Sequence, residues 1–144
     1  MVGILKQGLS PEQLALTFAV GTAVGLVPLL GAITTLAALV SFRLRLNVAA
    51  MQLISHMMTP IQFVLMIPLL RWGARLTGAA DKQELSLDSI RQLFATDWRG
   101  ALQLLWKAEL GALCIWALGS LPLVAVLFYG LRPLFRRMAR KKAE

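Results

Sequence analysis

The sequence predicts an all-α integral membrane protein, and the composition and the length of the apolar segments are the observations that predict it. Of the 144 residues, 58% are hydrophobic, which exceeds the usual share in soluble domains. Apolar segments cover residues 14–42, 46–70 and 110–131, and each reaches the roughly 20 residues that a membrane-spanning helix needs. We therefore expect one membrane domain over residues 1–144, with three embedded segments.

The first apolar segment carries helix breakers at its centre. As a single helix, residues 14–42 would be about 43 Å long, against a hydrocarbon core of about 30 Å. Pro28 has no backbone donor, and Gly25 and Gly31 beside it have unusual conformational freedom. We expect two half-helices, at about residues 14–26 and 30–42, in a spanning or a re-entrant arrangement. Such a break needs protein or a watery cavity around it.

The second apolar segment repeats this design. Pro28 and Pro60 are 32 residues apart, and so are Arg43 and Arg75. Two units with broken helices are typical of small transporters. The alternative is chance, since prolines are common in membrane helices.

Polar side chains recur at helical spacing on one face of the second segment: Gln52, Ser55, His56 and Thr59, with Gln62 beyond Pro60. They predict either hydrogen bonds between helices or a permeation or headgroup site, in which His56 could accept a proton. Residues 14–70 contain neither Asp nor Glu, and His56 is the only histidine. We therefore expect no metal, no cofactor and no enzymatic activity.

A headgroup site would combine the helix breaks, the polar face and the arginines that follow the two segments. Half-helix N-termini suit anionic groups, and interfacial arginines reach phosphates of bulk lipid or of a lipid substrate. The predicted substrate-binding residues are Pro28, Gly31, Thr34, Gln52, His56, Thr59, Pro60, Gln62, Arg43, Arg45, Arg71 and Arg75. Gly21 and Gly25 form a G-x-x-x-G, which predicts close packing of the half-helices or of two protomers, or a substrate groove.

Residues 79–109 predict two amphipathic helices along the membrane surface. Ser86 or Asp88 is expected to cap the first helix and Thr96 or Asp97 the second. The tryptophans Trp72, Trp98 and Trp106 suit the lipid–water boundary. The last apolar segment is expected to continue the second amphipathic helix and to kink near Gly119, Ser120 and Pro122.

The ends of the chain predict its orientation. Residues 132–144 hold six Lys and Arg directly after an apolar segment, which favours a cytoplasmic anchor on anionic lipid over nucleic-acid binding. The N-terminus lacks the pattern of a removable signal peptide. Cys114, the lone cysteine, is expected to be a small buried hydrophobic residue.

Several of these features together resemble the bacterial membrane proteins catalogued as domain-of-unknown-function family 2062. The matching residues, between positions 10 and 78, are Ser10, Pro11, Gly21, Gly25, Pro28, Gly31, Arg45, Asn47, Pro60, Pro68 and Gly78. Thr59 stands where the family pattern has Asn. Family members occur alone or joined to glycosyltransferase-like domains, so the resemblance implies handling of envelope glycolipids or lipid carriers.

The sequence leaves two classes of function open. One is a protein of the bacterial inner membrane that binds or moves an anionic lipid, a lipid-linked phosphate or a glycolipid. The other is a scaffold or accessory subunit of an envelope or glycosyltransferase assembly. The expected partners are membrane lipids with anionic headgroups and a second copy of the chain, and nucleic acid is not expected.

Overall fold

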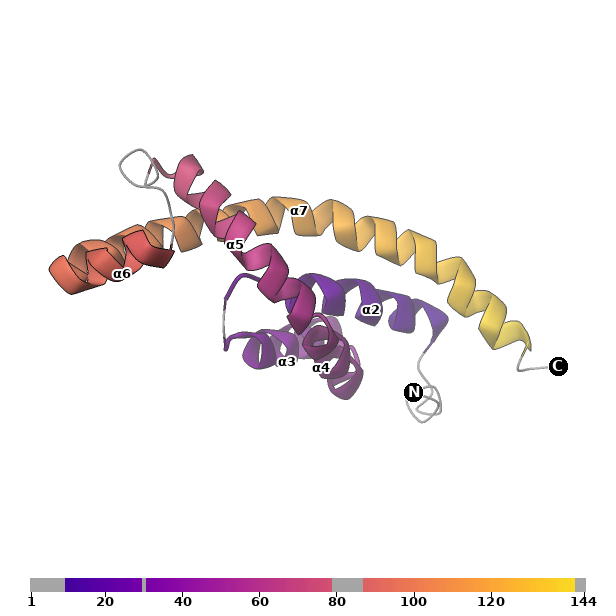
Figure 1. Cartoon of the computed structure of the whole chain (residues 1–144). Coiled ribbons are helices and arrows are strands. Elements are labelled where there is room, and N and C mark those ends of the chain that lie inside the picture. Colours follow the sequence, from indigo (N-terminus) through magenta and orange to yellow (C-terminus); the bar gives the residue numbers. More distant parts are fainter. Residues whose placement is uncertain (1–9, 30, 79–86, 142–144) are drawn as a thin grey trace.

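The computed structural model describes residues 10–29, 31–78 and 87–141, and all regular structure in this part of the chain is helical. The helices are α2 (Pro11–Gly25), α3 (Ile33–Leu44), α4 (Val48–Met57), α5 (Thr59–Leu76), α6 (Leu87–Thr96) and α7 (Trp98–Lys141). Helices α2, α3 and α4 form a lobe beside the long α7, and α5 leaves this lobe and crosses α7 (Figure 1). The predicted all-α class with broken helices is confirmed.

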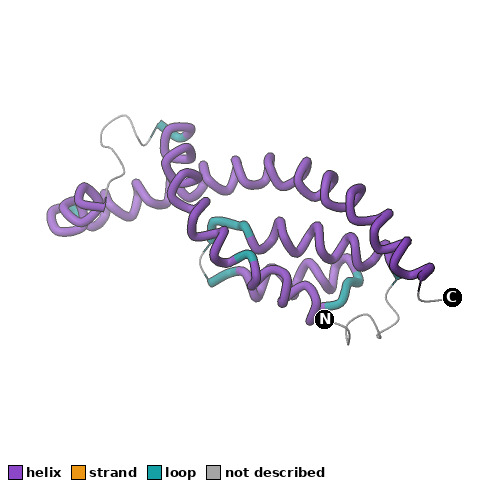
Figure 2. Tube along the Cα trace, turned by 45° about the vertical axis from the view of Figure 1, so that its right-hand side comes forward, coloured by secondary structure: helices purple, strands orange, loops and turns teal. Residues whose placement is uncertain are grey.

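The first apolar segment is a helical hairpin. Ser10 caps α2 through a capping box with Gln13, and α2 ends at Gly25 before the break. Gly31, in the break, has φ of +82°, which glycine adopts without a steric penalty. The half-helices α2 and α3 have 15 and 12 residues, so each is shorter than the roughly 20 residues of a span. They lie side by side and run in opposite directions (Figures 1 and 2), as expected for a re-entrant hairpin.

The second apolar segment is bent rather than folded back. Asn47 caps α4 by accepting a hydrogen bond from the backbone N–H of Ala50 at 2.8 Å. The helices α4 and α5 meet at Met58 with a bend of 58°. Pro60 lies in the first turn of α5, where its missing N–H has no helical partner to lose. The break predicted at this proline is confirmed, and α4 and α5 together are long and apolar enough to be one bent span.

Helix α7 has 44 residues and by itself is long and apolar enough to cross a membrane. Only 11% of its apolar 18-residue window is buried, unlike the core helix of a soluble protein. The expected kink near Pro122 is replaced by a continuous helix with smooth curvature (Figure 1). Asp97 caps this helix by accepting from the N–H of Gly100 at 3.0 Å. The second predicted amphipathic helix is therefore the first part of α7, while Ser86 lies outside the described residues.

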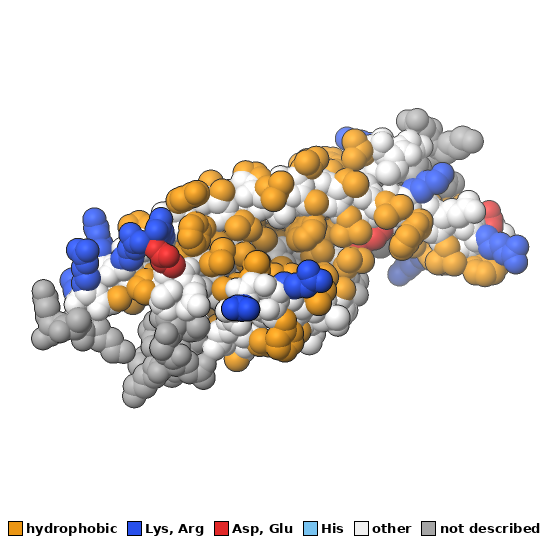
Figure 3. Space-filling view, turned by 180° about the vertical axis from the view of Figure 1, so that it is seen from behind, with side chains coloured by type: hydrophobic (Ala, Val, Ile, Leu, Met, Phe, Trp, Pro, Cys, Tyr) orange, Lys and Arg blue, Asp and Glu red, His pale blue; other side chains and the backbone are white. Residues whose placement is uncertain are grey.

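The interior consists of small residues, and large hydrophobic side chains point outward. Ala15, Ala19 and Ala108 are completely buried, whereas Val64 and Leu118 are more than 70% exposed. Hydrophobic side chains cover much of the face in Figure 3, and Lys and Arg gather toward its two ends and on the lower lobe. This distribution suits lipid as the surrounding solvent, because close backbone packing replaces the hydrophobic effect there. Cys114 is exposed on α7, so its predicted burial was wrong.

Glycines set the closest helix contacts. A Cβ at Gly25 would lie 2.6 Å from the carbonyl oxygen of Ser55 in α4, and a Cβ at Gly21 would lie 3.0 Å from Ile54. The G-x-x-x-G therefore packs the first segment on the second within one chain, rather than α2 on α3. A Cβ at Gly73 of α5 would lie 2.3 Å from backbone atoms of α7, so the crossing of these two helices also depends on glycine.

Candidate functional site

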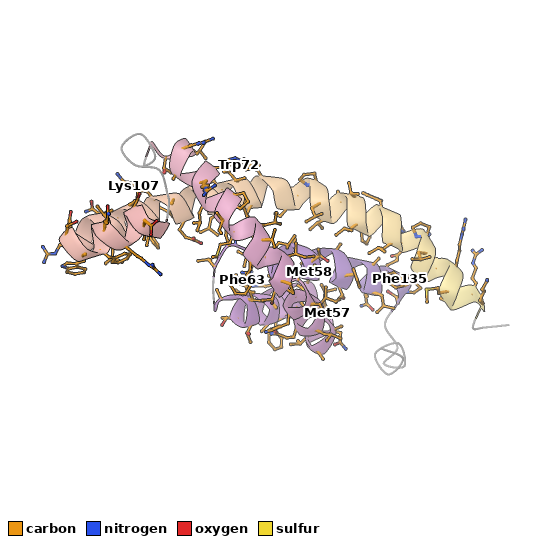
Figure 4. All side chains as sticks on the ribbon, in the orientation of Figure 1. Met57, Met58, Phe63, Trp72, Lys107 and Phe135 are labelled. Atoms are coloured by element: carbon orange, nitrogen blue, oxygen red, sulfur yellow. The ribbon has the colours of Figure 1, made fainter. Side chains whose placement is uncertain are left out.

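The two helix breaks contact each other through buried hydrogen bonds. The side-chain amide of Gln62, which is 1% exposed, donates to the carbonyl of Val27 at 2.7 Å. Ser55 Oγ donates to the carbonyl of Gly21 at 3.0 Å. A helix end at membrane depth needs donors for its free carbonyls. The second segment supplies one at Val27, and the indole N–H of Trp116 in α7 supplies another at Ala23, at 2.9 Å. Figure 4 shows Met57 and Met58 at the second break, beside the lobe.

The polar face of the second segment is therefore used largely for hydrogen bonds between helices. Gln52 Nε2 also donates to a backbone carbonyl of the first segment, that of Thr34, at 2.7 Å. His56 is exposed, and its Nδ1 lies 2.8 Å from the carbonyl oxygen of Gln52 within the same helix. It lies about 100° around α4 from the buried Ser55, which accounts for its exposure.

The predicted site residues differ widely in burial. Pro28 is buried, whereas Pro60 is exposed and Thr59 is half-buried. The remaining predicted residues lie on the exposed surface: Gly31, Thr34, Arg43, Arg45, Arg71 and Arg75. The amides of Gln52 and Gln62 donate to backbone carbonyls of the first segment, while their buried Oε1 atoms accept no hydrogen bond from a described residue. That these amides line a headgroup cavity stays a prediction.

A pocket of about 380 Å³ lies beside the first break, between α5 and α7. Its volume falls within the range of about 300–1,000 Å³ that is common for small-molecule sites. Its lining residues are Pro28, Leu29, Met66, Leu70, Leu102, Leu105, Trp106 and Glu109. Those of α5 are four positions apart, and those of α7 follow a spacing of three and four, so each helix contributes a single face. Pro28 is the predicted site residue that lines it.

Glu109 is the charged residue among those that line this pocket. Its Oε1 atom is buried, and no described residue donates a hydrogen bond to it. A carboxylate in such apolar surroundings is costly unless a partner compensates it. The sequence prediction missed Glu109 because residues 79–109 were assigned to the membrane surface. The helical spacing of Leu102, Leu105 and Trp106 with Glu109 was the available signal.

Basic residues follow the pocket lining on both helices. Arg71 comes directly after Leu70 in α5, and Lys107 directly after Trp106 in α7, and both basic side chains are exposed. Lys107 lies on α7 and Trp72 on α5, toward the end of the molecule where these helices cross (Figure 4). The Thr77 hydroxyl donates to the carbonyl of Lys107 at 3.3 Å, which joins the end of α5 to α7.

A second charged cluster joins the start of α2 to the end of α7. Arg132 donates to Glu12 Oε1 at 2.6 Å, and Arg136 donates to the same oxygen. The hydrogen bonds from Arg132 and Arg136 hold the pKa of Glu12 below its ordinary value. The first basic residues of the C-terminal tail therefore bind a carboxylate of the same chain.

Small buried residues, large outward hydrophobic side chains and contacting helix breaks describe an all-helical protein with one candidate membrane span, or two if α4 and α5 form one bent span. The chain belongs to the family described as "Uncharacterized protein conserved in bacteria (DUF2062)", whose model matches residues 2–144. The resemblance is thereby confirmed and extends beyond residues 10–78. No curated protein and no solved structure matches the chain significantly. Within the described residues, no group of three or more His, Cys, Asp or Glu could hold a metal ion.

Proposed function

We propose that the protein binds a phosphate-bearing lipid in the bacterial inner membrane and moves it between leaflets during envelope biogenesis. The observation that carries this proposal is the pocket between the first helix break, α5 and α7. Seven of its eight lining residues are apolar, so it suits part of an acyl or isoprenoid chain.

Polar contacts must supply the specificity of such a site. Transfer of a lipid tail from the bilayer into the pocket gains little, because lipid tails are as apolar as leucine. The exposed Arg71 follows the lining residue Leu70 by one position, about 100° around α5, so its long side chain would have to extend to the pocket mouth to reach the phosphate of the headgroup. The uncapped start of α3 at Ala32 adds backbone donors near the break, which favour an anion.

The re-entrant hairpin supports movement rather than simple anchoring. Its two helices are each shorter than a span, and the break that joins them contributes Pro28 and Leu29 to the pocket. A lipid held there would contact this short hairpin on one side and α5 and α7 on the other. An anchor needs neither the break nor the pocket.

The test is lipid movement in liposomes. Purified protein is reconstituted in phosphatidylglycerol-containing vesicles with a fluorescent phosphatidylglycerol, and the fraction that an impermeant quencher reaches is followed over time. We expect the protein to accelerate this exchange and Leu105→Trp, which fills the pocket, to abolish the acceleration. The control is Leu118→Trp on the same helix, where the side chain is 72% exposed. The proposal is refuted if the lipid exchanges equally fast without the protein, or if the Leu105→Trp variant still accelerates the exchange.

A scaffold or accessory subunit of an envelope or glycosyltransferase assembly is the second candidate. The observation that favours it is the internal use of Gln52, Ser55 and Gln62, which bind carbonyls of the first segment. Large exposed side chains such as Phe63 and Ile67 on α5 would then contact a second copy or another membrane protein. A stable oligomer in native mass spectrometry, together with no lipid exchange, would favour this candidate.

A further inference from the structure

The carboxylate of Glu109 indicates what the preferred ligand of the pocket carries. Glu109 is half-buried, its buried Oε1 atom accepts no hydrogen bond from a described residue, and no Lys or Arg lines the pocket. A carboxylate oxygen that water does not reach is stabilised by a cation or by hydrogen-bond donors. Because Glu109 lines the pocket, a ligand in the pocket can supply them.

Trp106 narrows the chemistry of that partner. It lines the pocket one helical turn before Glu109, so a ligand group in contact with the carboxylate also lies near an indole ring. Tryptophan is the aromatic residue that attracts cations best through its face. A carboxylate and an indole on one helix face together favour a compact cation. A protonated primary amine is such a cation, and it also donates hydrogen bonds.

The remaining lining residues place this amine on a lipid. The other lining residues are apolar, so the ligand continues as a hydrocarbon. The phosphate is the headgroup feature that the proposed function already assigns to this site. A headgroup that carries both a phosphate and an amine therefore fits the pocket.

We infer that the pocket selects an aminophospholipid, of which phosphatidylethanolamine is the simplest, with its ammonium group between Glu109 and Trp106. This inference rests on the proposed function, because it names the lipid class for the same pocket. It adds a preference that a general anionic-lipid site does not have, namely for a positive charge on the headgroup, so phosphatidylglycerol is the weaker ligand of the same pocket.

The experiment compares two lipids that differ only at the amine. Binding of phosphatidylethanolamine and of N-acetyl phosphatidylethanolamine with the same acyl chains is titrated by native mass spectrometry on the full chain in detergent. We expect the unmodified protein to bind the amine at least about tenfold more tightly, as a charged hydrogen bond predicts. Glu109→Gln should lose this preference. Asp88→Asn, which removes an exposed carboxylate of α6, should keep it.

The outcomes separate the inference from the proposed function. Equal binding of the two lipids by the unmodified protein overturns the amine preference, but leaves the pocket as a lipid site if Leu105→Trp weakens both. Binding that Leu105→Trp does not weaken overturns both proposals. A Glu109→Gln variant that still prefers the amine removes Glu109 from the recognition of the headgroup.

Discussion

The crossing of α5 and α7 should not tolerate a single added methyl group at Gly73. A Cβ there would lie 2.3 Å from the carbonyl oxygen of Ala108 and 2.3 Å from the backbone N of Ala112. Both neighbours are backbone atoms of a regular helix, so no side chain can rotate away. Even a separation of 3.0 Å, below which real Cβ contacts essentially do not occur, requires the helices to part by about 0.7 Å (3.0 − 2.3).

Two opposing contributions determine the expected stability of Gly73→Ala. Overpacking a close contact costs typically about 1–3 kcal/mol, whereas replacing glycine by alanine inside a helix gains up to about 1 kcal/mol. The contact is with backbone on both sides, so we expect a cost near the upper end and a net loss of about 1–2 kcal/mol. Gly111→Ala should behave alike, because its Cβ would lie 2.2 Å from the carbonyl oxygen of Gly73.

Unfolding by increasing mole fractions of dodecyl sulfate in mixed micelles, followed by tryptophan fluorescence, measures this loss. Gly119→Ala is the matched control, because it lies in the same helix and a Cβ there meets nothing within 4 Å. The control should be neutral or up to about 1 kcal/mol more stable. If Gly73→Ala is as stable as Gly119→Ala, the close crossing of α5 and α7 is wrong. The double exchange Gly73→Ala with Gly111→Ala should cost less than the sum, because one separation relieves both clashes.

Three further perturbations test other parts of the structure. Gln62→Leu leaves a buried carbonyl of the first break without its donor and should cost about 1–3 kcal/mol in the same unfolding assay; Gln52→Leu, at a more exposed position, should cost less. The pKa of Glu12 is lowered by two arginines of α7, so its stabilising contact is present above the unfolded pKa and is lost as pH falls through the folded pKa. The distance between the start of α2 and the end of α7, measured by fluorescence energy transfer, should therefore increase on acidification of the unmodified protein. The Glu12→Gln variant should show no such acid transition. Cysteine at Ala143 in a Cys114→Ala background should resist an impermeant maleimide in intact cells, and rapid labelling would contradict a cytoplasmic C-terminus.

The helix breaks could be predicted from sequence because they depend on local backbone chemistry. Pro28 removes a donor, Gly31 permits a positive φ, and Pro60 favours the start of a new helix. Each acts within one helical turn, so no knowledge of the rest of the chain is needed. The same reasoning overstated Pro122, because a long helix tolerates a proline where its surroundings satisfy the freed carbonyl.

The pocket could not be predicted from sequence because it depends on how distant helices pack. Pro28, Leu70 and Glu109 meet only because α5 crosses α7 at Gly73 and Gly111. The polar residues of the second segment presented the opposite problem. In the sequence, an amide that binds a ligand looks the same as an amide that binds a backbone carbonyl. For Gln62, the structure shows that the partner is the carbonyl of Val27.

The internal repeat has a structural counterpart, although the two units differ in shape. A shift of 32 residues maps the last residues of α2 and α3, Gly25 and Leu44, onto those of α4 and α5, Met57 and Leu76. Under this shift the ends of the helices coincide, but the loops between the helices do not.

The residues at each break account for this difference. In the first unit, residues 26–32 separate the helices and Gly31 adopts φ of +82°, so the chain reverses. In the second unit only Met58 intervenes, and Pro60 directly after Thr59 restarts the helix. The result is a bend of 58° and a helix that continues to α7. The first unit contributes the break between α2 and α3. The second unit contributes Gln62, whose side chain donates to the carbonyl of Val27 in that break. The pocket forms beside the break, between α5 and α7.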